Sequence, residues 1–196
     1  MIRFFDLLIS CLGLILLFPF FLIIGIAIMI NSRGGIFYIQ ARVGKKSKDF
    51  RLIKFRTMCS GAEKQGGLTI GARDSRVTNT GFFLRKYKLD ELPQLMNVLR
   101  GEMSLVGPRP ELRKYVDLYS EEQKKVLDVK PGITDIASLE YIDENSILGN
   151  SIDPEKTYIE QIMPAKLDLN RKFIENQRPC NYFRIIGLTL KKIFHS

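Results

Sequence analysis

Residues that bind zinc or form disulfides are scarce in this chain of 196 residues. Histidine occurs once, at His195, and the three cysteines, Cys11, Cys59 and Cys180, lie far apart without a C-x-x-C pair. A zinc site is built from several such ligands, so the sequence gives no reason to propose one. An odd number of scattered cysteines is typical of a reducing compartment. We expect His195 to be a tail residue rather than a catalyst.

The chain also lacks the glycine-rich loops that hold nucleotides, G-x-x-x-x-G-K-[ST] and G-x-G-x-x-G. Acidic residues are few between positions 31 and 100, where 15 Lys and Arg stand against 5 Asp and Glu. Because the whole chain has a net charge of +9, this segment accounts for its basic excess. Such an excess suits an anionic membrane surface, phosphates or nucleic acid. The aromatic residues here fit strand positions rather than a single-strand-binding module, so we expect no nucleic acid partner.

Charge is absent from the 24 positions between Leu7 and Ile30. An apolar run of this length can cross a bilayer core of about 30 Å as one helix and is long for a signal peptide. Pro19 in its middle removes one helical hydrogen bond and favours a kink. Two topologies are open: a kinked helix that crosses the membrane, or a helix that breaks at Pro19 and returns. Basic residues on both sides, Arg3 and Arg33 among them, mildly favour the re-entrant form.

The rest of the chain predicts an α+β fold with a small β-hairpin and a mainly helical remainder. Strands are expected over 36–43 and 50–55, joined by a turn. We expect a loop over 65–80 and a turn over 130–134. Predicted helices cover 81–88, 92–101, 111–119, 121–128, 153–176 with an interruption at Pro164, and 181–194. The last is basic and amphipathic, which suits either a membrane interface or packing against the core.

Two adjacent carboxylates, Asp90 and Glu91, precede one of these helices. The apolar positions that follow have helical spacing: Leu92, Leu95, Met96 and Leu99. Pro93 suits a first helical turn and Gly101 a stop. At such a helix start the free N–H groups and the helix dipole favour negative charge. The pair is therefore ready to bind a metal or to act as a nucleophile, with plain N-capping as the alternative interpretation.

Two arginines accompany this pair within 25 positions, Arg85 before it and Arg109 after it. Pro108 and Pro110 flank Arg109 and present it from a stiff backbone. Magnesium takes carboxylate and phosphate oxygens as ligands, and arginine binds phosphate oxygens in bidentate fashion. The four residues are therefore suited to a magnesium–diphosphate substrate.

Five motifs carry a resemblance to a known family. They are KFRTM at 54–58, LDELPQL at 89–95, NVLRGEMS at 97–104, VGPRP at 106–110 and KPGIT at 130–134. With the hydrophobic N-terminal segment, they resemble the bacterial sugar transferases called monotopic phosphoglycosyl transferases. The resemblance extends to about residue 134 and weakens after it.

The resemblance implies an enzyme that moves a sugar-1-phosphate from a UDP-sugar to polyprenol (undecaprenyl) phosphate and releases UMP. This reaction is the first membrane step of bacterial glycan or glycoconjugate assembly. A Mg²⁺ cofactor is implied, with Asp90 and Glu91 as its ligands. Asp90 is expected to be the nucleophile that forms an aspartyl phospho-sugar, and Glu91 to help position metal and phosphate. Arg85 and Arg109 are expected to bind substrate phosphate.

The resemblance also implies two parts. Residues 1–31 are expected to form a re-entrant membrane helix broken at Pro19, and residues 32–196 a cytoplasmic catalytic domain resting on the membrane surface. The expected location is the cytoplasmic face of the bacterial inner membrane, in contact with its lipids. The oligomeric state is open, with a homodimer as one option.

The chain departs from the family pattern at three places. Phe18 precedes the proline where a polar residue is common, and residues 135–142 replace the segment Gly-Trp-Ala-Gln-Val-Asn-Gly-Arg. Residues 181–183 lack the aspartate that many members carry in the C-terminal helix. The second difference leaves the sugar open. The alternative from another class is a non-catalytic, membrane-anchored basic binding or scaffold protein, against which the intact Asp90, Glu91 and Arg109 argue.

Overall fold

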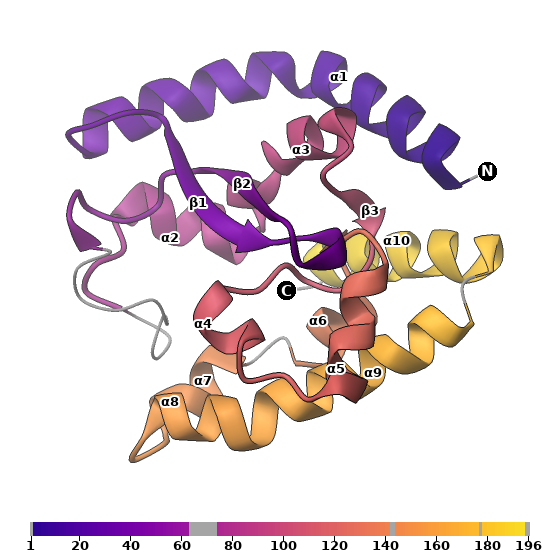
Figure 1. Ribbon diagram of the computed structural model, residues 1–196. Coiled ribbons are helices and arrows are strands. Elements are labelled where there is room, and N and C mark those ends of the chain that lie inside the picture. The colour runs from indigo at the N-terminus through magenta and orange to yellow at the C-terminus, as the bar shows by residue number, and fades with distance from the viewer. Residues whose placement is uncertain (1, 63–73, 142–143, 177, 195–196) are drawn as a thin grey trace.

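A single long helix, α1 (Ile2–Asn31), extends along one side of the protein in the computed structural model, which describes residues 2–62, 74–141, 144–176 and 178–194 (Figure 1). The helix is continuous through Pro19, and its axis bends over the remainder of the chain. The predicted break into two helices at Pro19 is therefore not confirmed. A proline removes one backbone hydrogen bond, and the bonds of the flanking turns can carry the helix past it.

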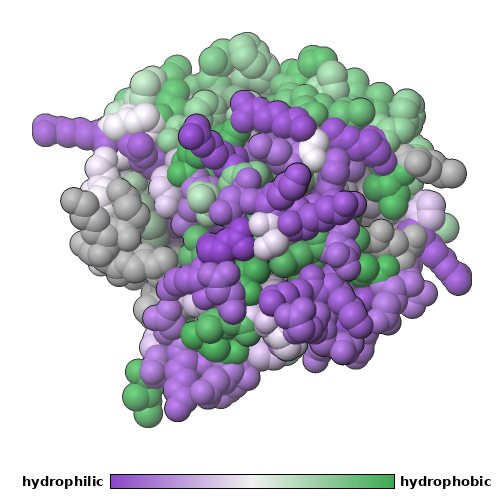
Figure 2. Space-filling model, viewed as in Figure 1, coloured by the Kyte–Doolittle hydropathy of each residue, from purple (hydrophilic) through white to green (hydrophobic). Residues whose placement is uncertain are grey.

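One face of α1 is apolar and exposed. Figure 2 shows hydrophobic side chains gathered over α1, whereas hydrophilic side chains cover much of the rest of this view. The exposed large apolar residues of α1 are Phe4, Leu7, Leu8, Leu12, Ile15, Leu16, Phe18, Phe20, Leu22, Ile23, Ile26, Met29 and Ile30. By length and composition, the helix could cross a membrane. A continuous apolar face of this kind is typical of a membrane-associated protein.

The predicted β-hairpin is confirmed. Strands β1 (Phe37–Val43) and β2 (Asp49–Phe55) pair antiparallel, with Phe37 opposite Phe55 and Val43 opposite Asp49. The short 3-10 turn η1 (Lys45–Ser47) lies between them. Lys46 and Ser47 have φ of 56° and 58°, in the left-handed region that non-glycine residues rarely adopt.

A second, parallel strand pair replaces part of a predicted turn. Strand β3 (Ser104–Val106) pairs with β4 (Gly132–Thr134), so the expectation of a turn over 130–134 is wrong for its last three residues. A Cβ atom on Gly132 would lie 2.1 Å from the Gly107 nitrogen, so the backbone at Gly132 approaches the backbone at Gly107 more closely than any residue with a side chain would allow. Three residues give too little alternation to predict a strand from sequence.

The remaining elements are mainly helical, as predicted. They are α2 (Asn79–Lys86), η3 (Leu89–Glu91), α3 (Gln94–Arg100), α4 (Arg113–Val116), α5 (Glu121–Lys124), η4 (Lys125–Asp128), α6 (Ile136–Glu140), α7 (Glu144–Gly149), α8 (Pro154–Thr157), η5 (Tyr158–Ile162), α9 (Met163–Glu175) and α10 (Pro179–Phe194). Gly101 ends α3 in a left-handed conformation, and Ser120 and Gln123 form a capping box. The interruption expected at Pro164 is a π-helical segment, η5, just before it. Most of the predicted 65–80 loop lies outside the described residues.

The apolar core connects α1 to the C-terminal helix. Tyr182 and Ile185 of α10 are buried with Leu95 and Val98 of α3, and Phe5 of α1 packs at the edge of this cluster. Leu188 and Leu190 of α10 stay exposed. Helix α10 therefore packs against the core along one face, in agreement with that alternative, and presents apolar side chains to the outside as well.

Candidate active site

Asp90 and Glu91 lie in η3, the short turn between α2 and α3. Lys88 just before them has φ 56°, a left-handed conformation that redirects the chain from α2 into η3. Both acidic residues are buried, each about 7% exposed. No side-chain hydrogen bond caps α3, which starts after Pro93. The position just before a helix is as predicted, and the N-capping alternative is not observed.

Glu91 binds two cations. The Lys54 ammonium lies 3.1 Å from Glu91 Oε1, and the Arg109 guanidinium donates to both carboxylate oxygens, with Nη1 3.3 Å from Oε2. Burial acts to raise the pKa of Glu91, but Arg109 and Lys54 outweigh it and hold that pKa well below its usual range. Glu91 is therefore ionised and already engaged.

Asp90 differs from its neighbour. Among the residues that the structure describes, no hydrogen bond or ion pair engages its carboxylate. Burial, and then the negative charge of Glu91, raises the pKa of Asp90, whereas Lys54, Arg85 and Lys88 act in the opposite direction. The Glu91 oxygens therefore accept hydrogen bonds from cations, whereas the Asp90 oxygens remain open to a ligand.

Arg85 comes to the site from the last turn of α2. Its Nε donates to Thr57 Oγ1 over 2.9 Å. Thr57 O also lies 2.0 Å from the position that a Cβ on Gly81 would take, so α2 packs directly on the chain after β2. Arg85 is largely desolvated, which lowers its pKa, and the Asp90 charge acts against that shift. The predicted grouping of Arg85 with Asp90 is therefore present.

The backbone carbonyl groups on both sides of Arg109 accept hydrogen bonds. Gly132 N donates to Pro108 O at 3.0 Å, and Arg42 Nη1 donates to Pro110 O at 3.3 Å. These contacts fix the segment that the two prolines stiffen. They place the guanidinium on Glu91, so the four predicted site residues form one acidic and basic centre.

Sequence reasoning missed Lys54 and Thr57 as members of this centre. Both lie in the KFRTM motif at 54–58, which the sequence offered as a signal without a role. The end of β2 brings them beside η3 and α2, 37 and 28 positions away along the chain from their partners Glu91 and Arg85. A one-residue shift of β2 would place Lys54 on the opposite face.

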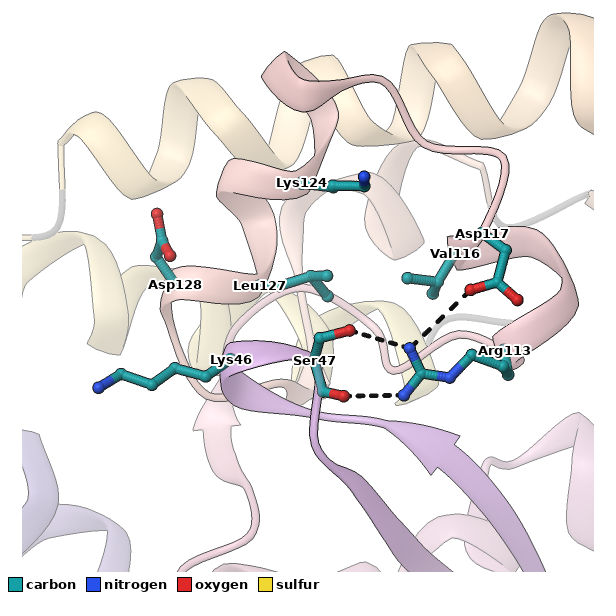
Figure 3. Close-up of a pocket in the computed structure, with 8 residues that line it drawn as sticks. All are labelled: Lys46, Ser47, Arg113, Val116, Asp117, Lys124, Leu127 and Asp128. Atoms are coloured by element: carbon teal, nitrogen blue, oxygen red, sulfur yellow. Dashed lines mark hydrogen bonds and ion pairs between the residues drawn. The ribbon is translucent and has the colours of Figure 1, made fainter.

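A surface hollow lies elsewhere in the described part of the chain. It has a volume of about 360 Å³, and Figure 3 shows it lined by Lys46, Ser47, Arg113, Val116, Asp117, Lys124, Leu127 and Asp128. Arg113 points across it to Ser47 and Asp117 (Figure 3). None of the four predicted site residues lines this hollow, so the chemistry is assigned by the acidic and basic centre and not by cavity size.

The donor set of the centre fits magnesium. Over the described residues, no group of three or more His, Cys, Asp or Glu side chains could hold a metal. Mg²⁺ is usually bound by one or two carboxylates together with water and substrate phosphates. Asp90 offers open oxygens, with Glu91 next to it, so these two residues suit a metal that arrives with a phosphate substrate.

An exposed apolar helix, together with a centre of two buried carboxylates and three neighbouring cations, is typical of a membrane-associated protein that acts on a charged ligand. The chain belongs to the bacterial sugar transferase family, whose pattern matches residues 1–196. The family predicted from the sequence motifs is therefore confirmed.

Named relatives extend this comparison. A UDP-N-acetylgalactosamine-undecaprenyl-phosphate N-acetylgalactosaminephosphotransferase of Aeromonas hydrophila is 42% identical over 132 residues, 66% of this chain and 31% of that protein. A UDP-glucose:undecaprenyl-phosphate glucose-1-phosphate transferase of Klebsiella pneumoniae is 41% identical over 137 residues, 68% of this chain and 30% of that protein. The sugar transferase EpsL of Bacillus subtilis is 37% identical over 199 residues, 99% of this chain and 87% of EpsL. The chain thus spans about a third of the first two relatives and most of the third.

Proposed function

We propose that this protein is a phosphoglycosyl transferase that moves a sugar-1-phosphate from a UDP-sugar to polyprenol phosphate and releases UMP. The observation that carries the proposal is the division within the acidic pair: Glu91 holds Arg109 and Lys54, and the buried Asp90 carboxylate is open. The Aeromonas and Klebsiella relatives, which are named as undecaprenyl-phosphate sugar phosphotransferases, support the same substrate class.

In the proposed reaction an Asp90 oxygen attacks the phosphorus that carries the sugar. An Asp90 O–P bond forms, the bond from that phosphorus to the bridging oxygen breaks, and UMP leaves with the electron pair. A phosphate oxygen of polyprenol phosphate then attacks the same phosphorus and releases the Asp90 carboxylate. The product is polyprenol diphospho-sugar, and the enzyme returns to its starting state.

The surrounding cations make this attack feasible. A carboxylate and a diphosphate repel each other unless positive charge offsets the repulsion. Arg109 and Arg85 are proposed to bind phosphate oxygens, and the ion pairs of Glu91 hold Arg109 and Lys54 in position. Burial deprives Asp90 of solvating water, which keeps its oxygens available for attack.

Mg²⁺ is proposed as the cofactor, held by the open Asp90 oxygens and by Glu91 Oε2, which among the described residues accepts a single hydrogen bond, from Arg109 Nη1 at 3.3 Å. When bound, it would neutralise diphosphate charge. Removal of divalent cations with EDTA is expected to stop UMP release, and added Mg²⁺ to restore it. Turnover that persists in EDTA would contradict this requirement.

The experiment measures UMP released from UDP-N-acetylgalactosamine and UDP-glucose, with undecaprenyl phosphate and Mg²⁺. Asp90→Asn is expected to reduce turnover at least about a thousandfold, because an amide oxygen is a poor nucleophile. Asp153→Asn is the matched control, since Asp153 caps α8 on the surface and Asn caps equally well. Incubation with the UDP-sugar alone should add a phospho-sugar mass to the peptide that contains Asp90. Normal turnover of Asp90→Asn would reject the covalent mechanism.

We also propose that α1 does not cross the bacterial inner membrane and that both of its ends lie on the cytoplasmic side. The contacts of α1 support this topology. Arg3 near its start bonds to α3, and Ile28 near its end packs with Phe55 and Leu84. A helix that touches one domain at both ends lies along the membrane surface more readily than it crosses to the other side. Helix α10, with its exposed apolar residues, is proposed to rest on the same surface.

A further inference from the structure

Helix α1 contains two charged residues, Arg3 and Asp6, among otherwise apolar and neutral positions. Both lie in its first two turns, and both contact the remainder of the protein through polar atoms. Asp6 is 2% exposed, which is rare for a carboxylate in an apolar helix. Docking of an apolar helix alone requires no such group, so these contacts call for an explanation.

Arg3 holds the end of α3. Its Nη1 donates to Val98 O over 2.7 Å and its Nη2 to Leu99 O over 3.2 Å. Carbonyl groups in the last turn of a helix are short of intrahelical donors, and the helix dipole there favours a cation. Because α3 follows Asp90 and Glu91 after only two residues, Arg3 fixes the helix directly after the acidic pair.

Asp6 holds β3 and α10. Its Oδ1 accepts three hydrogen bonds, from Ser104 Oγ at 2.9 Å, from Leu105 N at 2.9 Å and from Tyr182 Oη at 2.7 Å. Ser104 and Tyr182 are buried as well. A buried carboxylate is costly unless hydrogen bonds compensate it, so replacement of Asp6 by an apolar residue would leave several donors without their acceptor.

Strand β3 leads directly to Arg109. Three residues after Val106, the chain reaches Arg109, and this link is rigid for two reasons. Gly107 and Gly132 pack backbone against backbone, and Gly107 N donates to Thr134 O at 3.0 Å. Pro108 and Pro110 then restrict the backbone on both sides of the arginine. A displacement of β3 is therefore passed on to the Arg109 guanidinium.

We propose that Arg3 and Asp6 are positioning residues, which hold the segment of the acidic pair and the segment of Arg109 at a fixed separation from the first two turns of the membrane helix. The Glu91–Arg109 ion pair joins the same two segments at the site itself. Packing of α1 against the domain and positioning of Arg109 beside the acidic pair are thus coupled. The kinetic part of this inference rests on the proposed function, whereas the structural part does not.

The kinetic experiment uses the full-length protein in nanodiscs with undecaprenyl phosphate. Asp6→Ala is expected to lower kcat/KM for the UDP-sugar about tenfold, and Asp6→Asn, which keeps an acceptor oxygen, to restore most of it. Ser10→Ala is the matched control, because Ser10 is buried on the same helix and its Oγ has no partner in the described structure. Ser10→Ala should leave kcat/KM unchanged.

A double-mutant cycle separates positioning from general destabilisation. If Asp6 acts through Arg109, then Asp6→Ala should have little further effect, about twofold or less, in an Arg109→Ala background. Independent losses that multiply would overturn the proposal, as would an Asp6→Ala variant with unchanged kcat/KM.

Hydrogen exchange provides a readout that needs no turnover. In Asp6→Ala the Leu105 amide loses its acceptor, so a peptide covering 104–110 should exchange faster, while one covering 113–119 should not change. Tyr182→Phe removes only the hydroxyl donor to Asp6 and leaves the Leu105 amide hydrogen bond in place, so it should increase exchange at 104–110 by a smaller amount. This variant is the substitute test if Asp6→Ala does not fold. Unchanged exchange at 104–110 in the Asp6 variants would overturn the proposal. Absence of UMP release by the unaltered protein would instead reject the proposed function.

Discussion

Asp90 and Glu91 are neighbours in sequence with opposite environments. Glu91 binds Arg109 and Lys54 and its pKa is lowered, while the Asp90 pKa is raised by burial and by Glu91 itself. A position just before a helix exposes both residues to the same electric field of the helix dipole. The difference between their pKa shifts therefore arises from side chains of other segments, chiefly Arg109 and Lys54. At the residue scale, the proposed roles of Asp90 and Glu91 therefore rest on which of the two carboxylates binds the cations.

Replacement of Glu91 by Gln should destabilise the protein by about 2 kcal/mol, because it removes the charged acceptor of hydrogen bonds from Lys54 and Arg109, whose side chains are 19% and 38% exposed. Thermal unfolding in nanodiscs measures the change. Glu121→Gln is the control of the same chemistry, since Glu121 pairs with Lys124 on the surface and its side chain is 91% exposed. That variant should unfold like the unaltered protein. Equal melting temperatures for all three proteins would show that the ion pairs of Glu91 contribute little to stability.

Asp135 gives a pH prediction. It is fully buried at the start of α6, where it accepts a hydrogen bond from Ser138 N, and burial raises its pKa. The folded state then holds a proton on Asp135 more tightly than the unfolded state, whose pKa is about 3.9. Stability from this group therefore falls as pH rises from about 4 through the raised pKa.

Asp135→Asn should remove this dependence and keep the cap of α6, because Asn is also a good N-cap. Melting temperatures are measured from pH 4 upward. The melting temperature of the variant is expected to rise relative to that of the unaltered protein as pH increases, until Asp135 is ionised in the folded state. Parallel curves would exclude the raised pKa as a source of pH dependence.

At the scale of elements, local patterns predicted much of the fold. The hairpin, the helix after Asp90 and Glu91, its Gly101 stop and the Ser120 capping box were all readable because each depends on residues a few positions apart. The parallel pair of β3 and β4 was not, because its stability comes from a partner 28 positions away. The continuous helix through Pro19 also departs from expectation.

The contact between α2 and the chain after β2 is open to a glycine test. Gly81→Ala would place a Cβ 2.0 Å from Thr57 O, so α2 must move away and Arg85 should lose its bond to Thr57. We expect a fall in UMP release of about tenfold or more, together with a lower melting temperature. The control is Gly187→Ala in α10, where nothing lies within 4 Å and the change should stabilise the helix by about 1 kcal/mol. Unaltered activity of Gly81→Ala would argue against this role of α2.

At the scale of the molecule, α1 combines an exposed apolar face with polar contacts on the face that packs against the domain. Its apolar residues are exposed on one side, while Arg3 and Asp6 bond to α3, β3 and α10 on the other. The membrane segment is therefore part of the architecture that holds the site. Removal of α1 would unpair buried donors of the domain as well as detach the protein from lipid.

Topology can be tested with tags at both ends of the chain. In membrane vesicles of known orientation, a protease added to the cytoplasmic side should remove an N-terminal and a C-terminal tag alike, because both ends of α1 contact the same domain. Protease on the opposite side should remove neither. Cleavage of the N-terminal tag from the opposite side alone would establish a membrane-crossing helix instead.

The sequence by itself determined the apolar helix, the hairpin, the acidic pair and the family, because these follow from local periodicity, turn residues and contiguous motifs. Only the tertiary structure decided that Glu91 takes the cations and Asp90 stays open, and that Asp6 bonds to β3. Those contacts join residues 18, 37 and 98 positions apart. Such pairings depend on how the elements pack, and no local pattern specifies them.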